Sequence, residues 1–174
     1  MKLCSDMPHS QKKLENLKNR IIEVFENVSY PKGFITEHEC EECFGVRKAF
    51  LNKDWKDITS KTLEENYDKL PLFSPEAFHC FFPAYLIYSL EHFTEDDEVC
   101  DFTTFTLMVK CEEIEQKSDY WKNRFQFFTK NQINLVYEFM DLVIQNEAYD
   151  IFVSELECGK QILINYVEPT LKNN

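Results

Sequence analysis

Apolar residues recur every three or four positions along most of this chain, which is the spacing of amphipathic helices rather than of strands. The clearest stripe comprises Leu14, Leu17, Ile21, Val24 and Val28. Ser10 precedes this stripe as a candidate N-cap, and Pro31 follows it as a stop signal. The pattern therefore predicts a first helix between Ser10 and Pro31.

A second helix is predicted to begin at Thr36, because Thr36 and Glu39 have the spacing of a capping box. Acidic residues crowd its first turns and basic residues its end, which is the polarity that the helix dipole favours. Gly45 lies in the middle of this predicted helix, where glycine costs about 1 kcal/mol relative to alanine. We therefore expect a neighbouring segment to pack closely against Gly45.

The most apolar part of the chain follows Ser74 and Pro75, after a short polar helix predicted over residues 61–70. Serine caps helices and proline suits their first position, so these two residues predict a helix start. From residue 76 to about residue 93 nearly every position is apolar, which predicts a central helix covered on all sides. Pro83 removes one backbone hydrogen bond within it and is expected to kink it.

The C-terminal half predicts further helices. Residues 101–110 fit either a strand or a helix, and we favour the helix because no other segment resembles a partner strand. Residues 119–128 are predicted to be an aromatic-rich connection, and Thr129 is predicted to cap a helix that ends near Asn146. A last helix over about 149–167 is expected to bend at Gly159.

The predicted fold is an all-α, single-domain orthogonal bundle of six or seven helices around the helix that Pro83 kinks. The length of 174 residues suits one domain, so we assign residues 1–174 to it. Residues 1–9 and 172–174 are expected to be poorly ordered. The longest apolar run, near residues 77–88, is too short for a membrane span, which needs about 20 apolar residues.

The charged residues add information about possible partners. The chain carries 19 basic and 31 acidic residues, a net charge of −12, which argues against nucleic-acid binding because that needs a basic face. Acidic side chains concentrate between Glu91 and Asp119. Nine of them, which we call the acidic set, form the candidate interaction surface: Glu91, Glu95, Asp96, Asp97, Glu98, Asp101, Glu112, Glu113 and Glu115.

Acidic surfaces speed encounter with basic partners. The acidic set therefore predicts a non-catalytic interaction or regulatory module, of the immunity-protein kind, that binds a basic protein. An ordinary solvated surface is the alternative. No glycine-rich phosphate loop and no serine nucleophile elbow occurs in the sequence, so we do not predict an enzyme.

The seven cysteines are odd in number and irregularly spaced, and no apolar signal segment begins the chain. Both features favour free thiols without disulfides, and hence a cytoplasmic protein.

The densest group of chemically active side chains is His38, Cys40 and Cys43. Two cysteines three positions apart share a helix face, so they can be buried core residues or a pair of zinc ligands. A structural zinc site needs four ligands, and His79 or Cys80 is the candidate for the fourth. Otherwise Cys80 is expected to be a thiol in the core and His79 to be hydrogen-bonded.

Cys40 and Cys43 also have the spacing of a redox-active pair, in which the first thiolate lies at a helix N-terminus. Three features disfavour this third interpretation. Cys40 would lie a full turn inside a helix that begins at Thr36, the neighbouring glutamates would raise the thiol pKa, and no strand–helix–strand unit is predicted.

Several motifs together resemble a family of small uncharacterised bacterial proteins. They are the string from His38 to Cys43, then Trp55, then residues 70–78 (LPLFSPEAF) and residues 82–86 (FPAYL), and finally Phe128, Thr129 and Gln132 before an apolar helix. The resemblance extends over roughly residues 28–140. It implies a bacterial, cytosolic, helical protein and no particular activity.

Overall fold

The computed structural model describes residues 9–93 and 96–171. The predicted disorder of residues 1–9 and 172–174 therefore falls, apart from His9, outside the described residues. The described part contains eight α-helices and no strand, which confirms the all-α prediction. The helices are α1 (His9–Val24), α2 (Glu41–Phe50), α3 (Ser60–Glu64), α4 (Pro75–Glu91), α5 (Glu98–Phe105), α6 (Ile114–Phe125), α7 (Lys130–Ile144) and α8 (Val153–Ile162).

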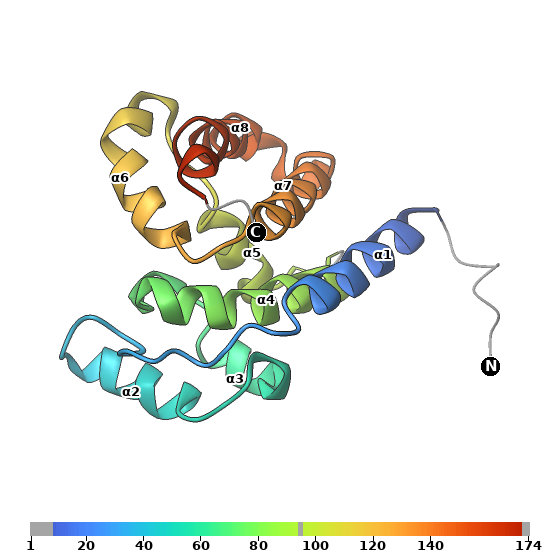
Figure 1. Ribbon diagram of the computed structural model, residues 1–174. Coiled ribbons are helices and arrows are strands. Elements are labelled where there is room, and N and C mark those ends of the chain that lie inside the picture. The colour runs from blue at the N-terminus through green and yellow to red at the C-terminus, as the bar shows by residue number, and fades with distance from the viewer. Residues whose placement is uncertain (1–8, 94–95, 172–174) are drawn as a thin grey trace, which may run out of the picture.

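Helix α4 lies at the centre, with α2 and α3 on one side and α6, α7 and α8 on the other (Figure 1). Ser74 begins it as predicted, because its hydroxyl oxygen accepts the N–H of Ala77 at 3.2 Å. The same hydroxyl donates to the carbonyl of Phe34 at 2.6 Å. The helix continues through Pro83, and most of its side chains are buried.

Helix α2 does not begin at Thr36. It begins at Glu41, and Cys40 is its N-cap. Thr36 is instead buried in an isolated β-bridge with Phe73, because the segment before α2 pairs with the segment before α4. Arg47 of α2 also holds the segment before α2, because its guanidinium donates to the His38 carbonyl at 3.2 Å.

Residues 119–128 are not a connection, since most of them belong to α6 (Ile114–Phe125). The buried residues of α6 are Ser118, Trp121, Arg124 and Phe125, which have helical spacing. The guanidinium of Arg124 donates to the carbonyls of Leu70 and Phe73 and lies 3.9 Å from the centre of the Phe78 ring. This buried arginine, which the sequence did not predict, attaches α6 to the turn that precedes α4.

Gly45 and Gly159 have different surroundings. Among the described residues, no atom other than those of its chain neighbours and its own helix backbone lies within 4 Å of a Cβ added at Gly45, so the expected close neighbour is not there. A Cβ at Gly159 would overlap the carbonyl oxygen of Leu107, so this glycine permits close packing of α8 against that backbone. Directly after α8, the backbone changes from α-helical to π-helical geometry over Leu163–Val167.

The prediction that the chain lacks disulfides is wrong, because Cys111 and Cys158 are bonded to each other. Their separation of 47 residues gives no local signal for this pairing. Packing brings them together: the N–H of Val109 donates to the carbonyl of Glu155 at 3.1 Å, which places the segment before α6 alongside α8. Cys40, Cys43, Cys80 and Cys100 are free.

Among the described helices, none has both the length and the apolarity to cross a membrane.

Candidate functional site

Cys40 and Cys43 occupy the N-cap and the third position of α2. Cys40 is exposed and has an extended backbone, with φ −119° and ψ 170°. Its Sγ accepts the backbone N–H of Cys43 at 3.4 Å. The side chain of Cys43 is 0% exposed. The pair is therefore asymmetric, with one sulfur facing solvent and the other covered by protein.

The two thiols also differ in acidity. Hydrogen bonding from the Cys43 backbone lowers the pKa of the Cys40 thiol, and the Glu42 carboxylate opposes this effect only weakly. The hydrogen bond with Cys40 raises the pKa of the Cys43 thiol, and burial adds to the rise. Position and acidity thus favour the same assignment, with Cys40 as the nucleophile and Cys43 as the protonated neighbour.

The other predicted zinc ligands lie elsewhere. His38 is exposed, and its carbonyl accepts from Arg47. The Nε2 atom of His79 is 3.0 Å from Oε1 of Gln132, and Cys80 is buried in α4. Within the described residues, no three histidine, cysteine, aspartate or glutamate side chains are grouped closely enough to hold a metal ion. The prediction that His79 is hydrogen-bonded is confirmed, and its side chain is half-buried.

The acidic set does not form one continuous surface. Asp97 caps α5 and accepts the hydroxyl of Tyr88 at 3.0 Å, while Asp101 accepts the hydroxyl of Tyr149 at 2.8 Å. Both carboxylates therefore hold the fold together. Glu91 pairs with Lys18. Glu95 lies outside the described residues.

The remaining members of the set are in two places. Asp96 and Glu98 are exposed at the start of α5. Glu112, Glu113 and Glu115 belong to the turn before α6 and to its first residues, and α6 begins at the top of the view in Figure 1, away from α4. In the described part of the chain, Asp96, Glu98, Glu112 and Glu115 form no ion pairs.

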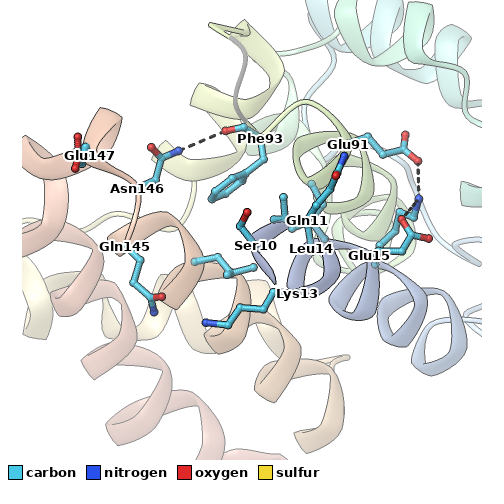
Figure 2. A pocket seen from close by; sticks show the side chains of 13 residues that line it. Ser10, Gln11, Lys13, Leu14, Glu15, Glu91, Phe93, Gln145, Asn146 and Glu147 are labelled. Atoms are coloured by element: carbon cyan, nitrogen blue, oxygen red, sulfur yellow. Dashed lines mark hydrogen bonds and ion pairs between the residues drawn. The ribbon is translucent and has the colours of Figure 1, made fainter. Parts of the chain in front are cut away.

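An open groove of about 830 Å³ is lined in part by Phe93, which precedes Asp96 and Glu98 in the sequence. Figure 2 shows side chains of α1 on one side of it and Gln145, Asn146 and Glu147 on the other. Its lining residues come from α1, α4 and α7 and the segments that follow α4 and α7: Ser10, Gln11, Lys13, Leu14, Glu15, Lys18, Leu90, Glu91, Phe93, Leu142, Gln145, Asn146 and Glu147.

The groove combines apolar side chains with three carboxylates and two lysines. The Nδ2 of Asn146 donates to the Phe93 carbonyl at 3.4 Å, which connects the end of α7 to the end of α4. Sequence periodicity predicts the apolar faces of α1 and α7. It does not predict that the start of α1 and the end of α7 lie on either side of one groove. The groove depends on which helices pack together, and no local sequence pattern predicts that pairing.

A family model described as "Family of unknown function (DUF6714)" matches residues 13–166. No curated protein and no solved structure matches the chain.

Proposed function

Because the chain belongs to this family of unknown function, which lends it no activity, we propose a function from its own surface. The protein is a non-catalytic interaction module, and its groove between α1 and the end of α7 binds a basic segment of a partner protein. Leucine or similar side chains of the partner contact the apolar part of the groove. Its lysine or arginine side chains approach the surrounding carboxylates.

The observation that carries this proposal is the combination of apolar and acidic groups at one hollow. Leu14, Phe93 and Leu142 supply partly buried apolar surface, and Glu147 is exposed beside them. Asp96 and Glu98 follow Phe93 by three and five residues, and neither is neutralised by a described basic group. Unpaired carboxylates beside an apolar surface give both attraction and contact area to a basic, amphipathic segment.

A charge-neutralisation experiment tests the location of the binding surface. The probe is a short fluorescent peptide that alternates leucine and lysine, and binding is followed by fluorescence anisotropy at low and physiological salt. The test variant is Glu98→Gln with Glu147→Gln. The matched control is Glu112→Gln with Glu115→Gln, which changes the net charge equally at the start of α6.

We expect the test variant to weaken peptide binding by about fivefold or more, since an exposed charge pair contributes up to about 1 kcal/mol. The control should change binding by less than about twofold. An equal loss in both variants would mean that the peptide responds only to net charge, and would contradict the proposed groove. Phe93→Ser gives an independent measurement, because it should weaken binding without any change in charge.

The proposed module acts in the cytoplasm, which is supported by the four free thiols of the described residues. The Cys111–Cys158 disulfide is the observation against that location. The redox state of this cysteine pair in the cell therefore tests the location.

A further inference from the structure

Cys40 and Cys43 are the only two free cysteines that share one turn of a helix within the described residues. Cys80 and Cys100 lie on different helices and are buried, and Cys111 and Cys158 are already bonded to each other. The groove proposed above does not include Cys40 or Cys43, so this pair belongs to a separate part of the molecule.

The start of α2 removes the main objection to redox chemistry at this pair. Cys40 is not a turn inside the helix but is its N-cap, so its Sγ faces backbone N–H groups that have no partner within the helix. The N–H of Cys43 already donates to that sulfur. An exposed sulfur held by a backbone donor is oriented to act as a thiolate nucleophile.

Cys43 has the complementary position. Its side chain is covered by protein, while its own backbone nitrogen lies 3.4 Å from the Cys40 sulfur. An incoming disulfide therefore meets Cys40 first. Cys43 lies in the same first turn of α2, three residues after Cys40, which is the Cys-x-x-Cys spacing at which the second thiol of a pair attacks the first.

We propose that Cys40 and Cys43 form a dithiol site that reduces disulfides by thiol–disulfide exchange. The Cys40 thiolate attacks one sulfur of R–S–S–R′, the S–S bond breaks, and R′S⁻ leaves and takes up the proton that Cys40 released. The Cys43 thiol then loses its proton and attacks the Cys40 sulfur. This step forms the Cys40–Cys43 disulfide and releases RS⁻, which the Cys43 proton converts to RSH.

Each turnover thus oxidises two protein thiols to one disulfide and reduces one substrate disulfide to two thiols. A small dithiol reductant returns the pair to its starting state by the same exchange in reverse. The substrate is recognised by its disulfide, which can belong to a small molecule or to a polypeptide, and the experiment below separates these two sources.

The experiment uses the full chain with Cys40 and Cys43 reduced, verified by thiol mapping. The protein is incubated separately with oxidised glutathione and with a peptide that contains one exposed disulfide. The reaction is quenched in acid, free thiols are alkylated, and the cysteines are mapped by mass spectrometry. Cys40→Ser is the main variant, because serine preserves the N-cap and therefore the start of α2.

In the wild type we expect a Cys40–Cys43 disulfide and two released thiols per protein. Cys43→Ser should stop at a mixed disulfide on Cys40, and Cys40→Ser should release thiol at least about a hundredfold more slowly. Cys100→Ser, on a different helix, should behave as the wild type does. Reaction with one probe only would identify the source of the substrate disulfide.

Two results would overturn the proposed exchange. One is that neither probe oxidises Cys40 in folded wild-type protein. The other is stoichiometric zinc that protects both thiols and is lost in Cys40→Ser. Neither result bears on the peptide groove, since Cys40→Ser should bind the leucine–lysine peptide as tightly as the wild type does.

Discussion

His79 is packed against the ring of Phe128, with 4.9 Å between the ring centres, and it is hydrogen-bonded to Gln132. Burial lowers the pKa of this histidine, and the hydrogen bond and Glu76 only partly offset that effect. In the unfolded chain the group recovers its ordinary pKa of about 6.5. The unfolded state therefore binds more protons than the folded state as the pH falls below that value.

From this we predict that His79 contributes to acid sensitivity. The free energy of unfolding should fall as the pH drops below about 6.5, where the unfolded histidine becomes charged. His79→Phe keeps an aromatic ring but loses the hydrogen bond to Gln132. Because phenylalanine cannot titrate, the free energy of unfolding of this variant should fall less as the pH drops. Urea titrations at about pH 7.5 and about pH 5.5 measure the difference, and the remaining histidines cancel between the two proteins.

An unchanged pH dependence in His79→Phe would mean that another group is responsible. Arg124 is a buried basic residue, and burial lowers its pKa to about 10. It therefore stays charged throughout this pH range and does not contribute to the slope.

At the scale of elements, Gly45 and Gly159 differ in what surrounds them. The first lies on the exposed surface of α2, and the second lies where α8 meets the backbone of Leu107. The two residues are equally poor helix formers by propensity. Only the packing of the helices separates them.

We predict opposite effects of the same substitution at these two positions. Gly45→Ala should raise the free energy of unfolding by about 0.5–1 kcal/mol, because alanine has the higher helix propensity and its methyl group clashes with none of the described residues. Gly159→Ala should lower it by about 1–3 kcal/mol, because the new methyl group forces α8 away from Leu107. Denaturant titration of the two variants beside the wild type checks both signs, and stabilisation by Gly159→Ala would contradict the close approach.

The disulfide belongs to the scale of the whole molecule, because it connects the segment before α6 to α8, 47 residues further along the chain. The chain-entropy model assigns about 4 kcal/mol to closing a loop of roughly 50 residues. We predict that Cys111→Ala with Cys158→Ala lowers the free energy of unfolding by up to that amount. The melting temperature of the variant should also become insensitive to reductant.

Cys80→Ala is a useful control, since it removes a buried thiol and leaves the disulfide intact. The wild-type protein should melt at a lower temperature in reductant, and Cys80→Ala should show the same downward shift. In the cell, a cytoplasmic protein should have Cys111 and Cys158 reduced, and alkylation before lysis followed by mass spectrometry measures this. A fully oxidised pair would place the protein in an oxidising compartment instead.

The sequence by itself determined the features that depend on neighbours a few residues away. Ser74 and Thr129 begin α4 and α7 as predicted, because a cap bonds to a backbone group three positions further along the chain. The apolar run after Pro75 indicated a buried central helix, since a helix without a polar face is covered on every side. The net charge follows from the residue counts alone.

The tertiary structure alone decided what depends on contacts between distant segments. Thr36 has the local pattern of a cap, yet pairing with Phe73 keeps it out of the helix and moves the start of α2 to Glu41. Cys40 becomes an N-cap for the same reason. The Cys111–Cys158 bond and the groove likewise require segments far apart in the chain, and sequence periodicity specifies which face of a helix is buried but not which helix covers it.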